Sequence, residues 1–204
     1  MKELGHRLSE SKEVIGEPVI NLLLVDLGSP QNIGLIVRTS WVLAGENVRL
    51  YIYDPRNKLE VNRDVVDLTS ITLVGEEGAY TKVDDLERFI SEYPGRIVAT
   101  DISEQSTSLV NFSFQRGDLL MFGNENRGYR DESLKEHLGI QHIANRLIVP
   151  MCGKKYELPD RGKAVPEDHG SYPNLNVATT VAIVTYAALE QLGGFEQFSL
   201  KDLQ

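Results

Sequence analysis

Short apolar runs alternate along this chain with stretches of helical periodicity, and this alternation limits the folds open to it. Six runs have the length of strands, and many of their residues are β-branched: 19–26, 48–53, 71–74, 96–101, 118–122 and 146–150. Nearly continuous apolar strands indicate a sheet that is buried on both faces and parallel. The sequence therefore predicts an α/β fold with a mostly parallel, six-stranded sheet and helices on both faces.

Two helices are predicted between these runs. The first begins at about Ile33, where Asn32 is placed to cap it, and ends near Gly45. The second carries an apolar stripe over residues 83–93 and is stopped by the Pro94–Gly95 pair. Strands and helices thus follow one another as expected for a parallel sheet.

The last predicted helix is the longest, from Leu175 to about Leu192, with Asn174 as its cap. Its apolar face is wider than the surface of one sheet requires. The residues that widen it are Val177, Val184 and Ala188. They indicate either a contact with a second subunit or a helix fully covered by the core of its own chain.

With 204 residues, 41% of them hydrophobic, the chain is long enough for one globular domain with a sizeable core. We expect an N-terminal extension over residues 1–18 and a single domain over 19–204. Residues 154–173 contain three prolines and no apolar periodicity, so they are predicted to form a long inserted loop.

Charge and cysteine content narrow the classes of function. A net charge of −9 argues against binding nucleic acid by bulk electrostatics, so any nucleic-acid site must be local. The first 18 residues show neither a signal peptide nor an anchor, and Cys152 has no second cysteine to pair with. We therefore expect a cytoplasmic protein in which Cys152 is a small buried side chain. The four histidines show no metal-ligand spacing, and no metal is expected.

Polar residues and glycines gather where three of the predicted strands end, which is where α/β sheets bind ligands. Residues 28–39, GSPQNIGLIVRT, follow the first strand, and residues 123–129, GNENRGY, follow the fifth. Residues 149–153, VPMCG, follow the sixth, and NLNV at 174–177 opens the last helix. The turn 123–129 is not a Walker loop, because Tyr129 and Arg130 stand where Lys and Ser/Thr are required, and it is not a dinucleotide-binding G-x-G-x-x-G loop after the first strand.

Taken in this order, the three turns resemble the motifs of the SpoU-type ribose 2′-O-methyltransferases of the SPOUT superfamily. The resemblance covers residues 19–192. The first motif is matched by Asn32, Gly34, Arg38 and Thr39, and the second by Gly123, Glu125 and Gly128. The third is matched by Val149, Pro150, Met151, Gly153, Leu175, Asn176 and Val177.

This resemblance implies a trefoil knot in the C-terminal part of the sheet and S-adenosylmethionine as the cofactor. It also implies a homodimer whose active site combines both subunits. By position in the motifs, five residues would surround the cofactor: Thr100, Gly123, Val149, Met151 and Leu175. The substrate would be the ribose 2′-hydroxyl of a tRNA or rRNA.

The resemblance also assigns catalytic roles. Arg38 would orient the 2′-hydroxyl and stabilise charge, and would act as a base only secondarily, because arginine side chains are protonated in proteins. Asn32 and Glu125 would fix the position of Arg38, and Asn176 would support the site. The expected RNA contacts are Arg127, Arg130, Lys154 and Lys155, with Arg161 and Lys163 in the inserted loop.

The chain departs from the family pattern at two points. Asn174 stands where the family commonly has serine, and the insertion 154–173 separates the two halves of the third motif. These departures and the acidic charge favour an alternative function, a catalytically silent RNA-binding or scaffold dimer of the same fold. Methylation of a base by a related knotted enzyme is a third hypothesis, which Arg38 and Glu125 disfavour.

Overall fold

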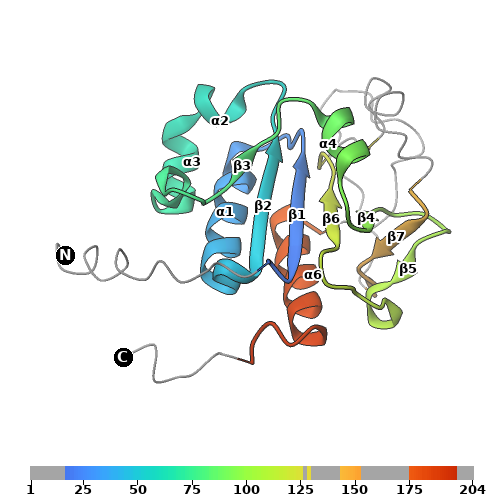
Figure 1. The fold of residues 1–204 in the computed structure, drawn as a ribbon. Coiled ribbons are helices and arrows are strands. Elements are labelled where there is room, and N and C mark those ends of the chain that lie inside the picture. The colour runs from blue at the N-terminus through green and yellow to red at the C-terminus, as the bar shows by residue number, and fades with distance from the viewer. Residues whose placement is uncertain (1–16, 126–127, 130–142, 153–174, 197–204) are drawn as a thin grey trace.

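A parallel sheet with helices on both faces forms the centre of the molecule (Figure 1). The structure is a computed structural model that describes residues 17–125, 128–129, 143–152 and 175–196. The sheet has seven strands, in the order β3-β2-β1-β6-β4-β7-β5, and each of its six strand pairings is parallel. The predicted α/β class and parallel sheet are confirmed, whereas the predicted number of six strands is wrong.

Five of the six predicted runs are strands. The strands are β1 Ile20–Val25, β2 Val48–Tyr53, β3 Thr81–Lys82, β4 Ile97–Thr100, β5 Thr107–Ser108, β6 Leu119–Phe122 and β7 Asn145–Ile148. The predicted strand at 71–74 is wrong, because Ile71 ends a helix in a left-handed conformation and Leu73–Gly75 form a 3-10 turn. A run of four residues, three of them apolar, does not distinguish a strand from a partly buried turn.

The helices are α1 Pro30–Ala44, α2 Lys58–Val61, α3 Arg63–Ser70, α4 Leu86–Glu92 and α6 Val177–Gln191. Both predicted caps need correction. Helix α1 begins earlier than expected, because the Ser29 hydroxyl accepts from the Asn32 amide and Pro30 suits the first helical position. Helix α6 begins later, and its cap is Asn176, whose side-chain oxygen accepts from the Ala178 amide at 2.8 Å.

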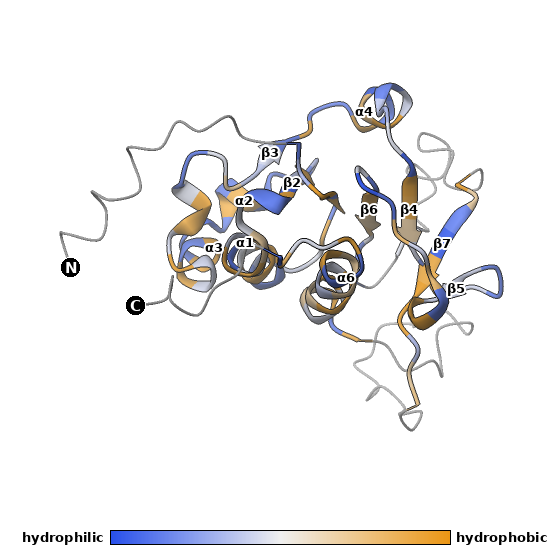
Figure 2. Ribbon diagram, turned by 60° about the horizontal axis from the view of Figure 1, so that its bottom comes forward, coloured by the Kyte–Doolittle hydropathy of each residue, from blue (hydrophilic) through white to orange (hydrophobic). Residues whose placement is uncertain are grey.

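Helices α1 and α6 lie on one face of the sheet and α4 on the other (Figure 2), and alternation along β1 divides the core into two corresponding layers. Ile20, Leu22 and Leu24 pack with side chains of α1 and α6, whereas Leu23 and Val25 pack with those of α4. Both sets are fully buried, as the two-residue period of a strand covered on both faces requires.

The three residues that widen the apolar face of helix α6 are buried in the core of their own chain. Val184 and Ala188 are 0% exposed and Val177 is 9% exposed, whereas Ile183 and Tyr186 on the same helix are 37% and 55% exposed. None of the described helices combines the length and apolarity needed to cross a membrane. Three predictions concern residues outside the described ones. The predicted knot depends on residues 126–127, 130–142 and 153–174, and the inserted loop 154–173 lies among them. Of the predicted N-terminal extension, only residues 17 and 18 are described.

Gly34 brings α1 into close contact with α3. A methyl group at Gly34 would lie 2.0 Å from Thr69 Oγ1 and 2.7 Å from the Val66 carbonyl oxygen, which is too close for any side chain. The Thr69 hydroxyl is itself directed back to the α3 backbone, 2.8 Å from the Val65 carbonyl oxygen. This motif-one glycine therefore serves the packing of two helices.

Replacement of Gly34 by alanine should destabilise the fold. The overlap with α3 should lower the free energy of unfolding by about 1–3 kcal/mol, more than the up to ~1 kcal/mol that alanine contributes through helix propensity. Denaturant unfolding of Gly34→Ala measures this. The matched control is Gly75→Ala, where the nearest neighbouring atom is 3.5 Å away and little change is expected. A Gly34→Ala protein at least as stable as the wild type would contradict the packing role.

Candidate active site

The ends of four neighbouring strands line one edge of the sheet. Strands β1, β6, β4 and β7 are adjacent and parallel, so their carboxyl ends face the same way. The first motif follows β1, the second follows β6, Thr100 ends β4, and the start of the third motif follows β7. The fold thus collects at one edge the turns that are far apart in the sequence.

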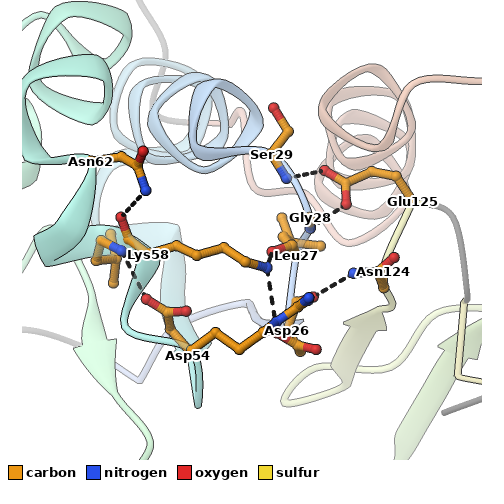
Figure 3. Close-up of polar contacts among 11 residues, drawn as sticks. Asp26, Leu27, Gly28, Ser29, Asp54, Lys58, Asn62, Asn124 and Glu125 are labelled. Carbon is orange, nitrogen blue, oxygen red and sulfur yellow. Dashed lines mark hydrogen bonds and ion pairs between the residues drawn. The ribbon is translucent and has the colours of Figure 1, made fainter.

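Glu125 joins the first and second motifs. Its Oε1 accepts hydrogen bonds from the Asn32 side-chain amide at 2.7 Å and from the Ser29 backbone amide at 3.1 Å, and its Oε2 accepts from the Gly28 backbone amide. Figure 3 shows the carboxylate facing these backbone amides. Both oxygens of Glu125 are therefore occupied by N–H donors. This arrangement makes Glu125 an anchor for the turn after β1.

Asn32 extends this connection to the third motif. Its side-chain oxygen accepts from the Asn176 side-chain nitrogen at 3.0 Å, while the oxygen of Asn176 caps α6. Asn32 lies in the first turn of α1, where its side chain reaches Glu125 and Asn176 instead of capping the helix. Three predicted catalytic residues, Asn32, Glu125 and Asn176, are therefore in one continuous hydrogen-bonded chain.

Arg38 lies apart from this chain. Its side chain is exposed on α1, and it makes no hydrogen bond or ion pair with any residue that the structure describes. Neither Asn32 nor Glu125 donates to it or accepts from it. The guanidinium is thus available to a ligand or to another protein chain, and a guanidinium suits phosphate and hydroxyl oxygens.

The predicted cofactor residues lie along the same edge. Thr100 donates its hydroxyl to the Met121 carbonyl oxygen at 2.8 Å, so its side chain is held within the sheet. Gly123 lets the turn close, because a methyl group there would lie 2.8 Å from the Gly128 carbonyl oxygen. Val149 and Met151 are partly exposed, and Leu175 is 37% exposed. These three apolar side chains are therefore accessible from outside the core.

Tyr129, in the second motif, was not singled out by the sequence. It is buried, and its hydroxyl donates to the same Met121 carbonyl oxygen that Thr100 contacts. Burial raises the pKa of the Tyr129 phenol, which therefore remains a donor at neutral pH. Tyr129 thus ties the turn after β6 to the sheet.

Other predictions are corrected or fall outside the described residues. Cys152 is exposed, not buried as expected, since it follows the end of β7 at the surface. The predicted RNA contacts Arg127, Arg130, Lys154 and Lys155 are not among the described residues, nor is Asn174. In the described part of the chain, no group of three or more His, Cys, Asp or Glu residues could hold a metal ion.

A cluster of charged residues beside the Glu125 turn was missed by the sequence analysis. Asp26 follows β1 directly, and its carboxylate is 2.7 Å from Arg56 Nε and 3.5 Å from Lys58 Nζ. The Asn124 side chain donates to the Asp26 carbonyl oxygen at 2.7 Å. The position of Asp26 and Asn124 after strand ends was the available signal, whereas nothing in the sequence showed that Arg56 and Lys58 reach back to them.

Comparison with known proteins identifies the family of this chain. The family model described as the SpoU rRNA Methylase family matches residues 19–154, which is more than half of the chain. Among curated proteins, none matches the sequence.

Solved structures share the fold. One, described as giving structural insights into the 2-OH methylation of C/U34 on tRNA, is 25% identical, with a TM-score of 0.59. The match covers 88% of this chain and 99% of that one. The TrmH/SpoU tRNA modifying enzyme of A. aeolicus is 20% identical, with a TM-score of 0.60 and coverage of 93% and 87%. AviRb from Streptomyces viridochromogenes, in complex with AdoMet, is 20% identical, with a TM-score of 0.58 and coverage of 86% and 58%.

Proposed function

Because the chain belongs to the SpoU rRNA methylase family, we propose that it transfers a methyl group from S-adenosylmethionine to a ribose 2′-hydroxyl of tRNA or rRNA. The observation that carries this proposal is the hydrogen-bonded chain from Glu125 through Asn32 to Asn176, which joins three motif turns at one sheet edge. The similar structures that concern 2-OH methylation of tRNA and AdoMet binding support the substrate and the cofactor.

The cofactor site would lie at the ends of β4, β6 and β7. When bound there, S-adenosylmethionine supplies a methyl group on a positively charged sulfur. Val149, Met151 and Leu175 would contact the adenine, and the backbone at Thr100 and Gly123 would border it. Because the hydroxyls of Thr100 and Tyr129 are already bonded to the Met121 carbonyl, they would shape the site without contributing a proton.

Arg38 would act on the RNA. The 2′-hydroxyl of a ribose is a weak nucleophile until its proton leaves, so catalysis requires correct placement of this oxygen and stabilisation of the charge that develops on it. The exposed guanidinium of Arg38 can donate to the ribose oxygen and to an adjacent phosphate. As the methyl group passes from sulfur to the ribose oxygen and S-adenosylhomocysteine leaves, the proton of the 2′-hydroxyl would pass to water or to an adjacent RNA phosphate oxygen. Glu125, whose two oxygens accept three hydrogen bonds, would keep the turn in place.

A homodimer would bring Arg38 to the site of a second subunit. Leu35, Arg38 and Val42 share one exposed side of α1, and Leu35 and Val42 are 40% and 72% exposed. On the neighbouring helix α6, Ile183 and Tyr186 are 37% and 55% exposed. Apolar side chains gathered around a charged residue are typical of an interaction surface. We infer that α1 and α6 form the subunit interface.

Removal of the Arg38 guanidinium should abolish most of the methyl transfer. We expect the wild type to bind S-adenosylmethionine in a calorimetric titration and to methylate tRNA or rRNA, with nuclease-resistant dinucleotides in the product. Arg38→Ala should lower turnover by about 100-fold or more while the cofactor still binds. Arg49→Ala, which removes an exposed arginine near the opposite end of β2, is the control and should retain activity.

Two outcomes would count against this proposal. A folded wild-type protein that neither binds the cofactor nor methylates RNA would favour the silent scaffold dimer. Equal turnover of Arg38→Ala and Arg49→Ala would show that Arg38 has no role in catalysis.

The proposed dimer interface leads to a second prediction, on the oligomeric state of two variants. In sedimentation velocity the wild type should be a dimer, and Val42→Asp should be a monomer, because a carboxylate would be placed in an apolar interface. Leu68→Asp is the matched control, since Leu68 is 79% exposed on α3, outside the proposed interface, and this variant should remain a dimer. A wild type that stays monomeric at micromolar concentrations would contradict this interface.

A further inference from the structure

Asp26 has an unusual conformation at the start of the turn that holds Glu125. It is 6% exposed and has a left-handed backbone conformation with φ 48°, which residues other than glycine adopt uncommonly. Its backbone amide donates to the Tyr53 carbonyl oxygen at 2.9 Å, and its own carbonyl accepts from Asn124 and Arg56. A strained conformation of this kind persists only where neighbouring contacts enforce it.

Two cationic side chains from the segment after β2, those of Arg56 and Lys58, hold Asp26 in this conformation. Arg56 contacts the Asp26 carboxylate through Nε and the Asp26 carbonyl at 3.1 Å through a second nitrogen. Lys58 contacts the same carboxylate, and its ammonium also donates to the carbonyl oxygen of Leu27. Lys58 is the more buried of the two, with 14% of its side chain exposed against 44% for Arg56.

Burying the Lys58 ammonium has a cost. Desolvation lowers the pKa of Lys58, and the nearby Asp26 carboxylate counteracts it only in part. A buried charge is retained where it has both an ion pair and hydrogen bonds, and Lys58 has both. Its neighbour Asp54 is also fixed, because it accepts from the Leu59 amide at 2.8 Å.

Lys58 and Glu125 hold one short turn from its two sides, as Figure 3 shows. Lys58 fixes the carbonyl of Leu27, and the next two amides, those of Gly28 and Ser29, donate to Glu125. A shift of the Leu27 peptide would therefore move the donors that orient the Glu125 carboxylate. The same carboxylate sets the position of Asn32.

From these contacts we propose that Lys58 is a positioning residue for methyl transfer, acting through the Leu27–Ser29 turn on Glu125 and Asn32. The inference rests on the proposed function. Lys58 does not touch the reacting atoms in this role. It sets the geometry of the chain of Glu125, Asn32 and Asn176 beside the proposed cofactor site, and a displacement of an ångström in such a site is enough to slow a reaction strongly.

The test compares Lys58→Met with Lys82→Met. Methionine keeps the length of the side chain and removes the charge. Lys82 is an exposed lysine on β3, and among the described residues it has no hydrogen bond or ion pair with the turn that holds Glu125. Turnover is expressed per cofactor-binding site, counted by calorimetric titration, so that loss of folded protein does not lower it. Lys58→Met should reduce kcat by about tenfold with little change in the KM for the cofactor. Lys82→Met should match the wild type.

Two further variants support the comparison. Lys58→Arg keeps a charged donor and should turn over faster than Lys58→Met. Asp26→Asn keeps the shape of the side chain, tolerates the left-handed backbone and weakens the acceptor for Lys58, so it should also lower kcat. If Lys58→Met binds no cofactor, the kcat of Asp26→Asn is compared with that of the wild type instead.

The outcomes separate the two proposals. A wild type without methyl transfer would overturn the proposed function and this inference with it. An active wild type whose Lys58→Met and Lys82→Met variants have equal kcat per cofactor site would overturn the inference alone. If Lys58→Met binds no cofactor, a kcat of Asp26→Asn equal to that of the wild type would overturn the inference.

Discussion

The carboxylate of Glu125 is the interaction on which the geometry of this molecule's site depends. It accepts from two successive backbone amides, those of Gly28 and Ser29, and from the side chain of Asn32. Hydrogen bonds to an ionised acceptor are stronger than neutral ones, and here three of them act on one partly buried group. The turn after β1 and the turn after β6 are therefore held as one unit, to which Asn176 attaches the start of α6. On the other side of the unit, Lys58 and Asp26 fix the same turn.

Much of the fold could be predicted from the sequence because burial on both faces leaves a plain pattern. The runs that became β1, β2, β4, β6 and β7 are apolar, and Gly45 marks the end of α1, whereas the sequence pattern places the cap of α1 at Asn32 and the structure places it at Ser29. The remaining elements lacked such a pattern. Strands β3 and β5 have two residues each, so they carry no periodicity, and in the run 71–74 Val74 is buried in a turn while Ile71 is 55% exposed. Gly34 is a motif residue in the sequence, but only the structure shows that its close neighbour is α3.

The site could be predicted in part. Asn32, Glu125 and Asn176 are in one hydrogen-bonded chain, as the motif order suggested, because parallel strands bring their following turns to one edge. The role of Arg38 was predicted from the family resemblance, and the structure leaves it exposed and without a bond to Glu125. Arg56 and Lys58 could not be found from the sequence, because a charged residue in a loop does not show which distant carboxylate it meets. Their contacts depend on how β2 lies beside β1.

A double-mutant cycle on Asn32 and Glu125 tests most directly whether this carboxylate joins the turns. The free energy of unfolding is measured in denaturant for Asn32→Ala, Glu125→Ala and the double variant. If the two side chains are bonded as the structure has them, the effects are not additive, and the coupling energy should be about 1 kcal/mol or more. Effects that add to within about 0.3 kcal/mol would show that Glu125 and Asn32 act independently, and would contradict the account.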